Sequence, residues 1–164
     1  MTELPWLNTA KKLVGTKEIP GLKSNKEITQ WAKLLGLDTL YTTDDIPWCG
    51  LFVAYCLAEN GIEPVVDPLW ALNWAKFGER VAPAYGTILA FSRNGGGHVG
   101  FYISEDQGAY HVLGGNQSDM VSIARVAKSQ FVAATWPSEY IGLYTTRNII
   151  ATLSIPVISN ASMT

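Results

Sequence analysis

The stretch TILAFSRNGGGHVGFYIS, residues 87–104, decides the fold class of this chain. Thr87 to Ser92 form a short apolar run, and three glycines after Asn94 permit a tight turn. From His98 to Ser104, apolar residues alternate with small or polar ones, as in a strand. Two such runs on either side of a glycine-rich turn predict antiparallel strands. The further strand candidates downstream are AYHVLGG, MVSIARV, FVAATW and YIGLYTT.

The first half of the chain is expected to be helical. Apolar residues recur at helical spacing from Trp6 to Val14 and again from Ile28 to Leu35. A third helix is predicted from about Pro47 to Glu59 and a short fourth one from Leu69 to Phe77. Helices first and an antiparallel sheet afterwards predict an α+β fold, with the N-terminal helices packed on the sheet.

Composition limits the organisation and the partners. The chain has 164 residues, of which 48% are hydrophobic and 16% are charged, and a net charge of -2 without a basic cluster. We expect one domain over residues 1–147, followed by an extra strand or tail over 148–164, and no nucleic-acid partner. Two cysteines and two histidines are too few for a disulfide framework or a metal site, so no metal or cofactor is expected.

The termini and apolar runs predict where the chain is made. The N-terminus MTELPWLNTAKKLVG lacks the continuous apolar core of a secretory signal. No run approaches the roughly 20 apolar residues of a membrane-spanning helix. The expectation is synthesis in the cytoplasm without a signal peptide, and no stable membrane insertion.

The stretch DDIPWCGLFVAYC, residues 44–56, holds both cysteines. Cys49 falls at the predicted start of a helix, where free N–H groups and the helix dipole stabilise a thiolate and bind an oxyanion. The alternative is a buried and inert cysteine, which is the common fate of a free thiol. Cys56 lies about two turns further on among apolar residues, so we assign it to the core.

A nucleophilic cysteine needs a base, and the chain offers two histidines. His98 opens a strand directly after three glycines, and the small Gly100 shares its face. His111 lies in mid-strand without such surroundings and is interpreted as a structural histidine. His98 is therefore the candidate base.

The third member would be a polar group that fixes the tautomer of the imidazole. The strand after that of His98 should return its far end, GGNQSD at residues 114–119, towards His98. Asn116 is the first candidate, Gln117 the second and Asp119 the third. The alternative is a polar loop that follows a pair of glycines.

DDIPWCGLFVAYC, APAYGTILAFSRNGGGHVGFYI, VLGGNQSD and ATWP together resemble the cysteine peptidoglycan hydrolases of the CHAP and NlpC/P60 superfamily. Within it they are most similar to a group of small phage and prophage lysin-like proteins. The resemblance implies a papain-like fold, with Cys49 as nucleophile, His98 as general base and Asn116 as orienting residue. Many CHAP domains place a Glu two residues before that Asn, where this chain has Gly114.

The function implied is hydrolysis of an amide bond in bacterial peptidoglycan through a thioester, either as an N-acetylmuramoyl-L-alanine amidase or as an endopeptidase. We further assign Trp48, Gly97, Gln117 and Trp136 to substrate binding, and Trp31, Trp70 and Trp74 to the core. A monomer released through a holin would act on the wall in the periplasm or outside the cell. The alternatives are a cysteine protease or acyltransferase with a protein substrate, and a non-enzymatic phage structural or binding module.

Overall fold

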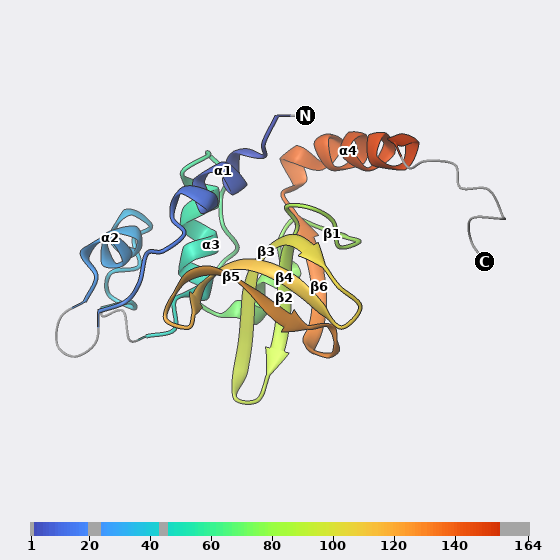
Figure 1. The fold of residues 1–164 in the computed structure, drawn as a ribbon. Coiled ribbons are helices and arrows are strands. Elements are labelled where there is room, and N and C mark those ends of the chain that lie inside the picture. The colour runs from blue at the N-terminus through green and yellow to red at the C-terminus, as the bar shows by residue number, and fades with distance from the viewer. Residues whose placement is uncertain (1, 20–23, 43–45, 155–164) are drawn as a thin grey trace.

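Helices and an antiparallel sheet make up the computed structural model, which describes residues 2–19, 24–42 and 46–154 (Figure 1). Three α-helices and a 3-10 helix precede the strands, and further helical elements lie between and after the last two strands, so helices and strands are largely segregated and the predicted α+β class is confirmed. The helices are α1 (Pro5–Lys12), α2 (Lys26–Leu34), α3 (Cys49–Ala58), the 3-10 helices η1 (Ala71–Lys76), η2 (Lys128–Gln130) and η3 (Ser138–Tyr140), and α4 (Ile141–Ser154). The strands are β1 (Glu79–Val81), β2 (Ile88–Arg93), β3 (Gly96–Glu105), β4 (Ala109–Gln117), β5 (Met120–Ala127) and β6 (Phe131–Trp136).

The six strands form one sheet in the order β1-β6-β2-β3-β4-β5, and every pairing is antiparallel. The hairpin predicted from residues 87–104 is present, with Phe91 opposite His98 and Arg93 opposite Gly96. Gly95 adopts a positive φ of 82° at the tip of this hairpin, which explains the glycine there.

Helix α3 is the centre of the core. Its apolar residues occur on all sides rather than in one stripe, which is typical of a fully buried helix. It contacts α1 and α2 on one side and strands β3 and β4 on the other, for example through Phe52 against Phe101 at 6.1 Å between ring centroids. The first face of the sheet is thereby covered by helices, as Figure 1 shows.

The second face of the sheet buries its own cluster. Leu89, Phe91 and Val112 are fully buried there, and all members of the cluster come from strands.

Three sequence predictions differ from the structure. The stretch YIGLYTT is not a strand: it ends η3 and begins α4, where Tyr144 packs edge-on against Trp136. Residues 148–154 continue α4 as helix rather than as an extra strand, and 155–164 lie outside the described residues. The fourth predicted helix is a 3-10 helix, and the short charged strand β1 was not foreseen.

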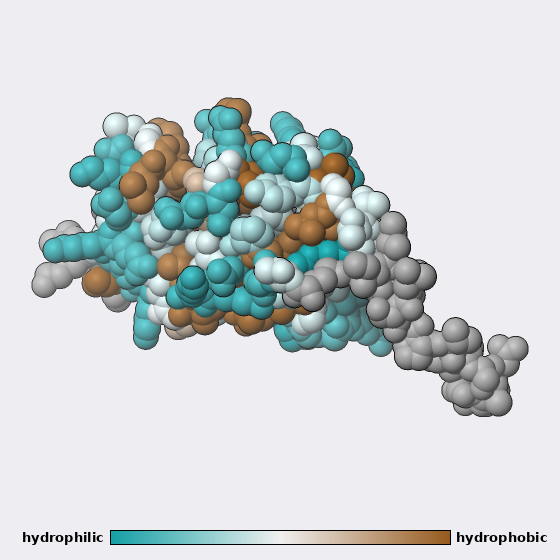
Figure 2. Space-filling view, turned by 90° about the horizontal axis from the view of Figure 1, so that it is seen from above, coloured by the Kyte–Doolittle hydropathy of each residue, from teal (hydrophilic) through white to brown (hydrophobic). Residues whose placement is uncertain are grey.

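No helix in the described ranges combines the length and apolar character needed to cross a membrane. In the space-filling view from above, hydrophobic residues lie in several separate groups among hydrophilic ones (Figure 2).

Candidate functional site

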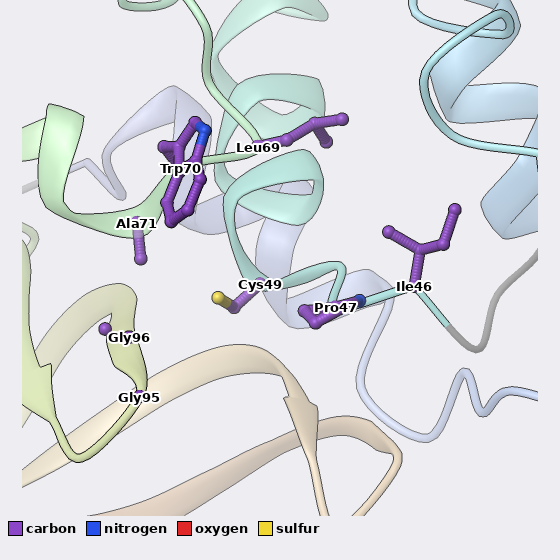
Figure 3. A pocket seen from close by; sticks show the side chains of 9 residues that line it. Ile46, Pro47, Cys49, Leu69, Trp70, Ala71, Gly95 and Gly96 are labelled. Atoms are coloured by element: carbon purple, nitrogen blue, oxygen red, sulfur yellow. The ribbon is translucent and has the colours of Figure 1, made fainter.

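Cys49 is the first residue of α3, and its sulfur points into a cavity of about 320 Å³ (Figure 3). The residue is only 6% exposed, and it lines this cavity. One wall of the cavity comes from the segment before η1 and the other from the β2–β3 hairpin. The lining residues are Ile46, Pro47, Cys49, Leu69, Trp70, Ala71, Gly95, Gly96 and Gly97.

Two glycines allow these walls to come close to the thiol. A Cβ on Gly50 would lie 2.0 Å from the backbone oxygen of Pro68, so the segment before η1 packs directly on the first turn of α3. A Cβ on Gly97 would lie 2.8 Å from the backbone oxygen of Phe91 and 2.9 Å from the side chain of Leu72. The assignment of Gly97 to the cleft therefore agrees with its place in the wall.

His98 is the third residue of β3 and is 3% exposed. Its ring packs against that of its cross-strand partner Phe91. The β3–β4 ladder begins only at Phe101 opposite Leu113, so the two strands are apart at the level of His98. The Cys49 thiol lies against the backbone N–H of Val99, the residue that follows His98. The backbone of β3 next to the candidate base His98 therefore reaches the Cys49 thiol.

Gln117 fixes the imidazole of His98. Its amide nitrogen donates to the backbone oxygens of Val112 at 3.0 Å and Ser122 at 2.7 Å. Its amide oxygen must therefore face His98, whose Nε2 lies 2.8 Å away. An amide oxygen only accepts, so Nε2 carries the proton and Nδ1 keeps a free lone pair. The contacts of Gln117 select the tautomer that a general base requires.

Asn116 does not hold the imidazole, and its expected placement there is wrong. Strand β4 contains an irregularity between Gly114 and Gln117, and Asn116 adopts a positive φ of 57° within it. This irregularity interrupts the simple alternation of side chains and turns Gln117 towards His98. Asp119 is exposed in the following turn, with a φ of 62°.

Gly114 makes room for the Gln117 side chain. A Cβ at position 114 would lie 2.6 Å from the amide oxygen of Gln117 and 3.4 Å from Nε2 of His98. The side-chain amide of Gln117 therefore fills the space beside the imidazole. A side chain at position 114 would need the same space.

Burial keeps both reacting groups neutral. It raises the pKa of the Cys49 thiol, although the N–H groups of Val99 and Gly50 act in the opposite direction. It also lowers the pKa of His98 from 6.5 to about 4, against the effect of the Gln117 hydrogen bond. The helix N-terminus therefore does not produce a resting thiolate, because desolvation of the thiol outweighs it.

Trp48 and Trp136 were predicted to line the cleft, and both predictions are wrong. Trp48 is fully buried against Trp31, and its indole N–H donates to Glu18 Oε2 at 3.0 Å. Trp136 is buried edge-on against Trp6 at 5.0 Å between ring centroids. Gln117, also predicted to bind substrate, contacts His98 instead and does not line the cavity.

Trp70 is the site residue that the sequence reasoning missed. It was assigned to the core because Trp70 and Trp74 are four residues apart, but only Trp74 is buried. Trp70 is 67% exposed and lines the cavity next to Cys49 (Figure 3). Pro68 gave no signal of this difference, because proline also suits the start of an α-helix.

The second histidine belongs to a structural cluster, as expected. His111 contacts Asp106 Oδ2 at 2.8 Å and Ser104 Oγ at 2.6 Å. Asp106 also accepts two hydrogen bonds from Arg125, which hold the pKa of its carboxyl well below the usual range. These contacts connect β3, β4 and β5 at the end of the β3–β4 hairpin.

Cys49 and Cys56 are both free thiols, and Cys56 is fully buried in the core. Among the residues for which the structure gives positions, no three or more His, Cys, Asp or Glu side chains gather in a way that would hold a metal. The sequence matches no model of a protein family, and a search of curated proteins gives no significant match.

Proposed function

We propose that the protein is a cysteine amidohydrolase with a papain-like fold of the CHAP and NlpC/P60 type, acting on an amide bond of bacterial peptidoglycan. The observation that carries the chemistry is the set of hydrogen bonds that holds the amide of Gln117: it leaves Nδ1 of His98 unprotonated, one residue before the Val99 N–H that contacts the helix-start Cys49. The sequence resemblance supplies the substrate. A purely structural module would have no need of a buried imidazole held in one tautomer on the strand that contacts a helix-start thiol.

The arrangement supports a general-base mechanism rather than attack by a resting thiolate. As the sulfur of Cys49 attacks the carbonyl carbon, its proton passes to Nδ1 of His98. The negative charge that develops on the carbonyl oxygen is stabilised by backbone N–H groups at the start of α3, including that of Cys49. Imidazolium then protonates the leaving amine, and a thioester remains on Cys49.

Water completes the cycle. Neutral His98 takes a proton from a water molecule, the hydroxyl adds to the thioester carbonyl, and the thiol leaves with the proton that His98 returns. Throughout both steps Gln117 accepts from Nε2 of His98, so the ring keeps the orientation in which Nδ1 faces the reacting atoms.

The test is incubation of the protein with purified peptidoglycan, followed by mass spectrometry of the released fragments. The expected result is release of new amine and carboxyl ends, and their identity distinguishes an amidase from an endopeptidase. Cys49→Ala should abolish release, whereas Cys56→Ala, the matched control in the same helix, should retain it. Fragments released equally by Cys49→Ala would refute the proposal.

A further inference from the structure

The β2–β3 hairpin, whose glycines line the cavity, also carries an exposed cation, Arg93. Arg93 is the last residue of β2, and it pairs across the hairpin with Gly96, which lines the cavity. His98 is two residues further along β3 than Gly96, so Arg93 and His98 share one face of the hairpin. Such diagonal neighbours lie about 7–8 Å apart, within reach of a long side chain.

The electrostatics agree with this placement. Burial is the main influence on both reacting groups, and the charge of Arg93 additionally lowers the pKa of Cys49 and of His98. A cation that lowers the pKa of both groups lies close enough to attract an anion bound beside them.

Arg93 has no anionic partner within the described part of the chain. It is exposed and takes part in none of the ion pairs found there. The exposed Arg125 differs, because Asp106 holds its guanidinium with two hydrogen bonds. The planar fork of an arginine is suited to bind a carboxylate with two hydrogen bonds.

We propose that Arg93 is a specificity-determining residue that binds a carboxylate of the substrate close to the scissile amide, while Trp70 on the opposite wall contacts an uncharged part. The preferred substrate is therefore an anionic peptide rather than a neutral one. This inference rests on the proposed function, in which the carboxylate belongs to the stem peptide of peptidoglycan.

Two small reagents test the carboxylate site directly on the intact protein. Iodoacetate and iodoacetamide both alkylate a thiol: the sulfur of Cys49 bonds to the methylene carbon and iodide leaves. They differ in the carboxylate of the first and the neutral amide of the second, so the ratio of their rates reports attraction of the anion. We expect Arg93→Gln to lower the iodoacetate rate at Cys49 about fivefold at low salt and to change the iodoacetamide rate less than about twofold.

Arg80→Gln is the matched control. Arg80 lies in β1, at the edge of the sheet, and its side chain bonds to the backbone oxygen of Ala75. This variant removes the same charge and should leave the ratio unchanged, and Arg93→Lys should retain part of the preference. An unchanged ratio in Arg93→Gln, or an equal fall in Arg80→Gln, would overturn the inference.

The outcome is independent of peptidoglycan hydrolysis. If the alkylation ratio does not depend on Arg93, the proposed carboxylate site is wrong, but the proposal of a Cys49-dependent hydrolase is unaffected. Conversely, a protein that releases no wall fragments but alkylates in an Arg93-dependent way would contradict the proposed function and support the anion site.

Discussion

The burial of His98 predicts that the folded protein loses stability as the pH falls below the ordinary pKa of an imidazole. The side chain is 3% exposed, and burial lowers its pKa from 6.5 to about 4. The unfolded chain therefore takes up a proton near pH 6.5, whereas the folded protein does so only near pH 4. The stabilisation is present above the unfolded value and is lost progressively on the way down to the folded value.

The size of this loss follows from the gap between the two values. A difference between 6.5 and about 4, at about 1.4 kcal/mol per pH unit, corresponds to about 3 kcal/mol. Carboxylates with a lowered pKa, such as Asp106, also destabilise the folded state in acid, but their contribution begins at lower pH. A variant that lacks only the imidazole separates the two effects.

The assay is urea unfolding of the native protein and of His98→Gln at about pH 8 and about pH 4. Glutamine is neutral at both values and can still donate to the amide oxygen of Gln117. We expect the native protein to lose about 3 kcal/mol more unfolding free energy than the variant does between these conditions. Equal losses would mean that His98 titrates like an accessible imidazole, and the neutral resting base would have to be abandoned.

Three further predictions concern the walls of the site and its two cysteines. Iodoacetamide should modify Cys49 at least about tenfold faster than Cys56, because Cys56 is fully buried and its pKa lies well above the ordinary value. Peptide mass spectrometry measures both rates, and equal rates would contradict an accessible nucleophile at Cys49. Gly114→Ala should lower turnover about 100-fold, because the new methyl group displaces the amide that orients the base, whereas Gly108→Ala, with no neighbour closer than 3.9 Å, should be silent. Trp70→Ala should raise KM and leave the unfolding midpoint unchanged, since Trp70 is 67% exposed. A lower midpoint with an unchanged KM would mean that Trp70 stabilises the fold and does not bind substrate.

Local patterns were sufficient to place Cys49 and His98. The neighbouring residues predict both a helix start and a strand start. In the structure Cys49 begins α3, and His98 lies near the beginning of β3. The α+β class followed from the same periodicities. The long-range step, which brings β3 against the start of α3 at Val99, is not contained in these local patterns.

The orienting residue and the cleft aromatics were not predictable in this way. The choice between Asn116 and Gln117 depends on one residue with a positive φ in an irregular strand end, and simple alternation does not contain that irregularity. Trp70 is exposed because the segment before η1 is not α-helical and packs on α3 through Gly50. Trp48 is buried instead by contacts with Trp31 and Glu18, which are distant in the sequence. The only sign of such a close backbone approach in the sequence is a glycine, and a glycine alone does not show which segment will pack against it.

The neutrality of the pair has a consequence for how the enzyme would be controlled. A preformed thiolate is reactive towards any electrophile or oxidant, whereas the thiol of Cys49 is held neutral by its own burial. Proton transfer to His98 becomes favourable only as the sulfur bonds to a carbonyl carbon and the charge moves to an oxygen facing the start of α3. In the proposed hydrolase, the same burial that lowers the rate of unassisted thiol chemistry would therefore restrict reaction to substrates that fill the cavity between Trp70 and the hairpin glycines.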